Sequence, residues 1–189
     1  MAIFEVIDQT IVEGDDSATL GVASVSHTIP AGYEHLKVCV IAKTNSTSTN
    51  YYDSLKTTIN ADTNNAYYLN QLYGSGSSAG GSNGVTQISW YTGLVSSRDR
   101  PMTKAYGVAE MVFANASGTS NYKGQFTKTY NNQYQRSSTE GTVYNLIAYQ
   151  HHYRDASRDA RITSIGFAPY TGSLFLRGSV FTTYGIKSS

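Results

Sequence analysis

The chain has 189 residues, 14% of them charged, and a formal net charge of +1. This length suits one domain, residues 1–189, that buries its core without disulfide bonds or metal. The near-neutral charge lacks the basic stripe of a nucleic-acid-binding protein. No apolar run reaches the roughly 18 residues of a membrane span, and residues 1–10 lack the pattern of a secretory leader. We therefore expect no nucleic-acid partner and no membrane insertion.

Glycine and tyrosine are abundant, with 17 and 16 copies, whereas proline occurs three times. Tyrosine and threonine favour strands, and glycine, serine and asparagine favour turns. Strong helix formers never cluster, so we expect an all-β chain with little or no helix. The single cysteine, Cys39, excludes a disulfide within the chain and is expected to be a small buried apolar residue.

Six strands are predicted in the first half of the chain. They cover 3–12, 18–28, 35–44, 54–60, 66–73 and 85–92. The segment 35–44 alternates most clearly, with Leu36 and Val38 on one face and Lys37 on the other. The Gly/Ser run at 74–84 predicts a flexible exposed loop.

Five more strands are predicted in the second half, at 104–114, 122–130, 142–152, 161–167 and 174–187. The segment 104–114 is apolar on both parities, as expected for a central strand. The last two strands are expected to form a C-terminal hairpin, and 93–103 and 131–139 to be irregular. About ten antiparallel strands at this spacing predict a single, jelly-roll-like β-sandwich. Its predicted core comprises Leu36, Val38, Val40, Val112, Ile147, Ile165, Leu176, Val180 and Tyr184.

No motif with catalytic chemistry is present. Asn60, Asp62 and Asn64 have the spacing of a calcium loop, but Asn65 and Gln71 replace its required glycine and glutamate. An Asx turn is the favoured interpretation. Adjacent histidines at 151–152 point to opposite faces of a strand and cannot easily share a metal. No nucleophile elbow or phosphate loop occurs. We therefore predict that the chain has no catalytic residue, binds no cofactor or metal, and is not an enzyme.

Two clusters combine tyrosine with amide or histidine side chains, at 130–135 and 149–153. Such residues suit sugar stacking, suit a hydrated protein interface, and also simply fill strand positions. The candidate interface or glycan contacts are Tyr130, Asn132, Tyr134, Tyr149, His151 and Tyr153.

The order of several short segments resembles that of a known protein family. A turn and strand, IPAGYEHLKV, precedes an "N-x-D" turn and a tyrosine strand, and the chain closes on GSVFTTYGI. The matching residues are Asn60, Asp62, Tyr67, Gly178, Ser179, Phe181, Tyr184, Gly185 and Ile186. This pattern is similar to that of small jelly-roll virion structural proteins of tailed bacteriophages, which lie on particle exteriors. The resemblance implies no active site. Apolar residues on both parities of 104–114 and the many tyrosines predict a homo-oligomer, and the resemblance implies that it is a trimer.

The expected function is that of a non-enzymatic structural protein on the virion exterior, made in the host cytoplasm. Because no heptad stalk precedes the domain, we favour a capsid decoration or cement protein that docks on the major capsid protein. The alternative is a tail fibre, collar or receptor-binding component that contacts tail proteins and recognises host-surface glycan. A glycan-degrading enzyme is the competing class, and it would need two carboxylates placed across a groove.

Overall fold

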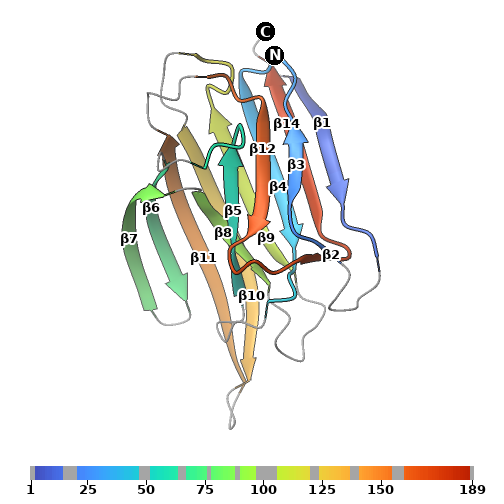
Figure 1. Cartoon of the computed structure of the whole chain (residues 1–189). Helices are drawn as coiled ribbons and strands as arrows, with labels where there is room; N and C mark the ends of the chain where they lie inside the picture. Colours follow the sequence, from blue (N-terminus) through green and yellow to red (C-terminus); the bar gives the residue numbers. More distant parts are fainter. Residues whose placement is uncertain are drawn as a thin grey trace.

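The computed structural model describes residues 3–14, 21–46, 52–63, 67–75, 78–87, 90–96, 106–119, 124–136, 141–154 and 160–187. Within these ranges the chain is all-β, with fourteen strands and no helix (Figure 1). Every pairing between strands is antiparallel. The predicted all-β sandwich is confirmed.

Two large sheets form the sandwich. The eight-stranded sheet has the order β1 (Ile3–Ile11), β14 (Val180–Lys187), β4 (His35–Ala42), β9 (Gly107–Ala114), β10 (Gly124–Arg136), β11 (Gly141–Arg154), β6 (Tyr67–Ser75) and β7 (Ser78–Gln87). The four-stranded sheet has the order β3 (Val25–Thr28), β12 (Ser164–Pro169), β5 (Tyr52–Ile59) and β8 (Trp90–Ser96). A short pair joins β13 (Phe175–Leu176) to β2 (Gly21–Val22).

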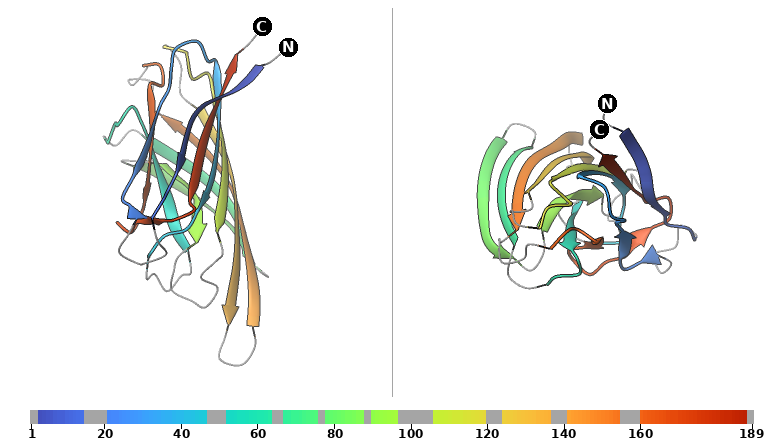
Figure 2. Two further views of the ribbon diagram at one scale, coloured as in Figure 1. Left: turned by 90° about the vertical axis from the view of Figure 1, so that its right-hand side faces the viewer. Right: turned by 90° about the horizontal axis from the view of Figure 1, so that it is seen from above.

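The strand order is that of a jelly roll. When β2, β13 and the hairpins β6–β7 and β10–β11 are set aside, eight strands remain. Numbered along the chain, they lie in the orders 1-8-3-6 and 2-7-4-5, which is the double Greek key of a jelly-roll sandwich. The two hairpins extend one sheet beyond this framework, and from above that sheet curves around the smaller one (Figure 2).

The core lies between the two sheets. On β4 the side chains of Leu36, Val38 and Val40 are completely buried, and the residues between them are half-buried. Phe181 lies at the centre of an aromatic group, with ring centroids 5.4 Å from Phe167 and 4.8 Å from Phe175. Five predicted core residues are confirmed as buried, namely Leu36, Val38, Val40, Ile165 and Leu176.

Three other core predictions are wrong. Val112 is 39% exposed, because the odd-numbered residues of β9 face the core. Val180 and Tyr184 are half-buried, and the neighbouring Phe181 is in the core. The predicted alternation of buried residues fails after Leu176 because 174–187 is not one strand. Gly178, at φ 78°, lies between β13 and β14. The side chain of Ile147 lies outside the described residues.

The predicted C-terminal hairpin is also wrong. β12 pairs with β3 and β5 in the four-stranded sheet, whereas β14 pairs with β1 and β4 in the other sheet. The segment between them therefore crosses from one sheet to the other. A period of two identifies a strand but does not identify its neighbours.

Several predicted loops are strands. The Gly/Ser run contributes the end of β6 and most of β7, and these strands pair from Leu69 with Gly84 to Ser75 with Ser78. Main-chain hydrogen bonds need no side chains, so glycine does not prevent pairing here. The predicted loop at 131–139 continues β10 as far as Arg136. The predicted strands at 18–28 and 85–92 are each divided, between β2 and β3 and between β7 and β8.

Candidate interaction surface

The "N-x-D" turn ties one sheet together. Asn60 and Ala61 both have φ of 54°, and the amide of Asp62 donates to the carbonyl of Ile59 at 3.0 Å, as in a type I′ turn. The side-chain oxygen of Asn60 accepts hydrogen bonds from the amides of Thr163 at 2.7 Å and Ser164 at 3.2 Å. Asn60 thus joins β5 to the start of β12, where a local Asx turn was predicted.

Tyr67 fixes the same turn from the other side. Its side chain is completely buried. The hydroxyl accepts from the amide of Ile59 at 3.0 Å and donates to the carbonyl of Asp62 at 2.8 Å. The Ile59 amide and the Asp62 carbonyl are main-chain groups, so Tyr67 holds the end of β5 in place.

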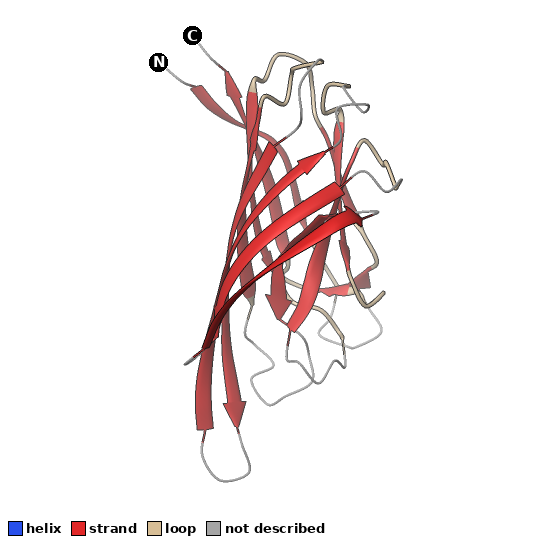
Figure 3. Cartoon of the chain, turned by 90° about the vertical axis from the view of Figure 1, so that its left-hand side faces the viewer, coloured by secondary structure: helices blue, strands red, loops and turns tan. Residues whose placement is uncertain are grey.

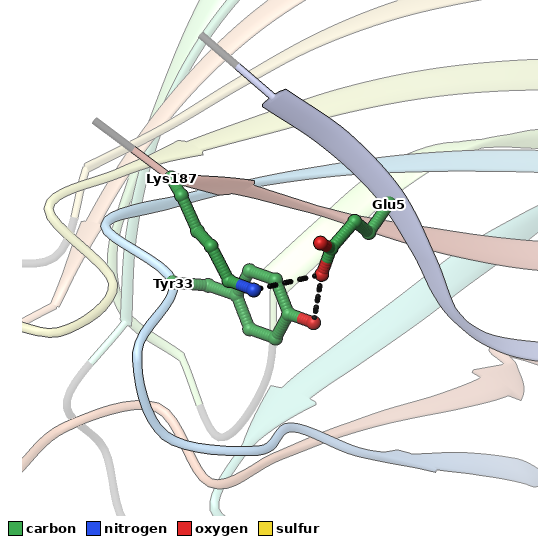
Figure 4. Close-up of polar contacts among 3 residues, drawn as sticks. All are labelled: Glu5, Tyr33 and Lys187. Carbon is green, nitrogen blue, oxygen red and sulfur yellow. Dashed lines mark hydrogen bonds and ion pairs between the residues drawn. The ribbon is translucent and has the colours of Figure 1, made fainter. Parts of the chain in front are cut away.

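The closing motif is equally structural. A Cβ on Gly185 would overlap the ring of Tyr33, so glycine is required for this close approach. The Tyr33 hydroxyl donates to the Glu5 carboxylate at 2.7 Å, and the Lys187 ammonium donates to the same oxygen at 2.9 Å (Figure 4). These hydrogen bonds lower the pKa of Glu5 and raise the pKa of both partners. The cluster joins β1, β14 and the loop before β4.

Two buried polar groups connect distant segments. The ring of His27 lies between two threonine hydroxyls, with Nδ1 2.7 Å from Thr183 and Nε2 3.2 Å from Thr10. Burial lowers the pKa of His27, and the charge of Asp8 opposes that shift. Asp53 accepts hydrogen bonds from hydroxyl groups of the loop after β12. Each group is hydrogen-bonded to residues of a different segment of the fold.

The described residues form no cluster of metal ligands, and the thiol of Cys39 is partly buried. Within the described ranges, no group of three or more His, Cys, Asp or Glu side chains could hold a metal ion. Cys39 is half-buried on the outer parity of β4 and not fully buried as expected, and burial raises its pKa. The described part of the chain also contains no helix with the length and apolar character needed to span a membrane.

The structure brings the two predicted aromatic clusters onto one hairpin. Tyr130, Asn132 and Tyr134 belong to β10, and the other three candidates, Tyr149, His151 and Tyr153, belong to β11. Lys128 pairs with Tyr149, and Phe126 pairs with His151. Because opposed residues of an antiparallel pair share a face, all six candidates occupy one parity of the hairpin. The two clusters are separate in the sequence, and only the pairing of β10 with β11 shows that they are neighbours.

This hairpin extends beyond the rest of its sheet (Figure 3). β9 pairs with β10 only up to Tyr130, and β6 pairs with β11 only from Leu146 onward. From Asn131 to Arg136, β10 therefore has β11 as its only neighbour in the described pairing. Such a two-stranded ribbon is marginally stable by itself, so contact with another molecule would favour it.

The outer face of the eight-stranded sheet carries a second feature, which the sequence did not locate. One row of directly opposed residues crosses five strands through Val6, Tyr184, Lys37, Val112 and Phe126. Val6 is 59% exposed and Phe126 is 48% exposed. The register places Phe4, Ile11, Ile41 and Leu72 on the same face. Among the described residues, seven of the nine exposed large hydrophobic side chains thus lie there.

The charges of this apolar face are few and partly paired. The Lys37 ammonium and the Glu110 carboxylate form an ion pair, and their hydrogen bond raises the pKa of Lys37. Lys128 stands directly opposite Glu110 on β10. The face is therefore close to neutral. The apolar residues on both parities of 104–114 were the only signal of this face in the sequence.

The outer face of the four-stranded sheet differs. It contains a shallow depression of about 300 Å³, whose lining includes Ser26, Lys56, Thr58 and Gly166. The Lys56 ammonium lies 5.7 Å from the ring centroid of Tyr170 at the margin. Most of the residues that line it are small or polar, and the largely buried Val25 and Phe167 also contribute to the lining.

No family model matches the sequence, and no curated protein matches it. Among solved structures, the chain is similar at 7% identity and a TM-score of 0.28 to a fructofuranosidase from Schwanniomyces occidentalis complexed with fructose. The match covers 98% of this chain and 34% of that enzyme, so the chain spans about a third of its length. A likeness of this degree carries no argument about activity.

Proposed function

We propose that this chain is a non-enzymatic structural protein on the exterior of a tailed-bacteriophage virion, and specifically a decoration protein of the head. The main support is the outer face of the eight-stranded sheet, where large apolar side chains are exposed and the charges are few and partly paired. Such a face fits an assembly protein. The jelly-roll order and the resemblance of the turn and closing motifs to virion proteins add to this support.

The residues of the turn and closing motifs support the fold and contribute no chemistry of their own to the proposal. Asn60, Tyr67 and Gly185 each hold one segment of the fold against another. Such contacts make the fold rigid, as a lattice-docking protein requires. We propose that it forms a homo-oligomer, a trimer, and contacts the major capsid protein.

Copy number on purified particles tests the location. A decoration protein is expected at hundreds of copies per particle on quantitative gels, and modest affinity per copy then suffices through avidity. A count of a few to a few dozen would contradict the head location and favour the tail.

The alternative is a tail fibre, collar or receptor-binding component that recognises host glycan. Its support is the single parity shared by the six tyrosine, amide and histidine candidates on β10 and β11. Binding of host surface polysaccharide, lost when Tyr134 and Tyr149 are replaced by alanine, would favour this reading. Release of new sugar ends during the same incubation would overturn the proposal that the chain is not an enzyme.

A further inference from the structure

We propose that the outer face of the eight-stranded sheet, over β1, β14, β4, β9 and β10, is covered by a second copy of this chain. This inference rests on the proposal of a homo-oligomer but not on its being a trimer, because a face that packs against the same face of another copy closes a two-fold dimer. The surface consists of two mainly apolar rows, the first of which includes Lys37, and of a row between them that contains Glu110 and Lys128. One row is that of Val6 and Phe126, and the other contains Ile11, Val180, Ile41 and Val108.

The area of this surface is sufficient for a stable contact. Strands about 4.8 Å apart that rise about 3.4 Å per residue give five strands of eight residues an area of roughly 650 Å². Two such faces bury about 1,300 Å² together, which falls within the size range of specific protein interfaces, ~1,200–2,000 Å².

The charges favour a neutral partner. Glu110 is already paired with Lys37, and Lys128 stands opposite it, so the face presents alternating signs with little net charge. An anionic lipid surface or a nucleic acid would find no cluster of cations there. A second copy presents the same alternation of Lys and Glu, so that the acidic residue of one copy can meet a basic residue of the other.

The shape of the surface also favours a copy of the same sheet. Sheets pack face to face with their strands within about 30° when both have the same twist. A second copy supplies that twist, and it supplies apolar rows with the same spacing. Its exposed residues at the β1 edge, Phe4 at 60% and Val6 at 59%, add contact area to a neighbouring face.

The first experiment compares Val112→Glu with a matched control, Thr58→Glu. Both positions lie within strands on outer faces, on β9 and on β5. Light scattering of the wild type at micromolar concentration should give a multiple of the 20.5 kDa chain. Val112→Glu should raise the dissociation constant by about a hundredfold or more, because it places an unpaired carboxylate in the contact. Thr58→Glu should leave the mass unchanged.

Phe4→Ser provides a second variant with little risk to folding, because Phe4 is 60% exposed at an edge strand. It should weaken association at least several-fold, while the thermal midpoint of the separated chain stays the same. If an oligomeric wild type keeps its mass in both Val112→Glu and Phe4→Ser, this surface assignment is wrong, although the proposed oligomer stands.

The native thiol supplies an independent readout. Cys39 lies on the outer parity of β4, between Thr182 and Glu110 in the register. Its rate of labelling by a maleimide should fall as protein concentration rises, and Val112→Glu should abolish that fall. A wild type that is a single chain at every concentration would overturn the inference. Protection of Cys39 only on assembled particles would assign the face to the shell, which overturns the second-copy inference and leaves the decoration proposal intact.

Discussion

The two outer faces of the sandwich differ in the residues that they expose. On the four-stranded sheet the outward positions of β3, β12 and β5 carry small or polar residues such as Ser26, Thr58 and Gly166. On the eight-stranded sheet the outward positions include Phe4, Val6 and Phe126, all about half exposed or more. Both faces cover the same core, so the requirements of folding do not explain the difference.

This contrast separates two kinds of apolar residue. The residues between the sheets stabilise the fold, and those on the large outer face add nothing to the core. Scattered surface hydrophobic residues are normal, but seven of the nine exposed large hydrophobic side chains among the described residues lie on one face, and Tyr170 lies beside Lys56 of the other sheet. This uneven distribution is what the proposed contact with a second copy would produce.

The largest expected effect compares the core with the apolar face. Phe181→Ala should lower the free energy of unfolding by about 3–5 kcal/mol, because it removes a completely buried ring. Phe126→Ala should cost less than about 1 kcal/mol when the chain is dissociated. Urea unfolding at a concentration where the protein is a single chain measures both. Similar losses for the two variants would show that Phe126 belongs to the fold.

The second effect compares two glycines. Gly185 faces the Tyr33 ring, and a Cβ there overlaps ring atoms close to the main chain, so the loop must move. Gly185→Ala should cost about 1–3 kcal/mol. Gly166 lies on the polar outer face, and its nearest contact is the Thr58 hydroxyl oxygen, at 2.6 Å from an added Cβ. That hydroxyl can rotate away, so Gly166→Ala should cost less than about 1 kcal/mol.

Equal midpoints for the two alanine variants in urea would contradict this comparison. Replacing Tyr33 by leucine in the Gly185→Ala background provides a control, because the smaller side chain removes the overlap. Part of the lost stability should return in that double variant, as expected for two residues in direct contact.

The third effect concerns the link between the two sheets. His27 on β3 contacts Thr10 on β1 and Thr183 on β14, and burial lowers its pKa below the usual value of about 6.5. The unfolded chain therefore binds the proton more readily than the folded chain. The stability that neutral His27 contributes is present above about pH 6.5 and is lost as the pH falls below that value, by at most ~1.4 kcal/mol per pH unit.

Urea midpoints between pH 7.5 and 5.5 measure this loss. His27→Gln keeps polar atoms near both threonines and does not titrate in that range, so its stability should depend less on pH. Wild type and variant with the same pH dependence would assign the effect to other groups.

Sequence reasoning recovered the local features of the fold. The alternation of Leu36, Val38 and Val40 identified a half-buried strand correctly, and the turn around Gly32, at φ 97°, followed from its residues. These features depend on neighbours in the chain. The partner of each strand depends on contacts far along it, so β12 and β14 were joined in a hairpin although they lie in different sheets.

The candidate surface shows the same limit of local patterns. The apolar residues on both parities of 104–114 indicated a surface in need of a partner, and Val112 lies on it. Val6, Lys37 and Phe126 come together only through the register of four strand pairs. Likewise β7 is glycine-rich and has little strand propensity, and its pairing with β6 overrides that local preference.

The smallest expected effect lies within the apolar face. The Lys37–Glu110 pair is partly exposed, at 34% and 42% for the two side chains. In the single chain, a double-mutant cycle with Lys37→Met and Glu110→Gln should give a coupling of only about 0.2–1 kcal/mol. Added salt should weaken that coupling, since exposed charges are screened over a Debye length of about 10 Å at 0.1 M.

Association changes the expected result of the same cycle. If a second copy covers the face, water leaves the pair, and removal of one charge strands the other in the contact. The single variants should then weaken association, and the double variant should restore much of it. Measured by light scattering over a dilution series, the coupling should exceed its value in the single chain and depend less on salt. An equal, salt-sensitive coupling in both states would mean that water still reaches the Lys37–Glu110 pair. The outer face of the eight-stranded sheet would then not be covered by a second copy, although its residues differ from those of the other outer face.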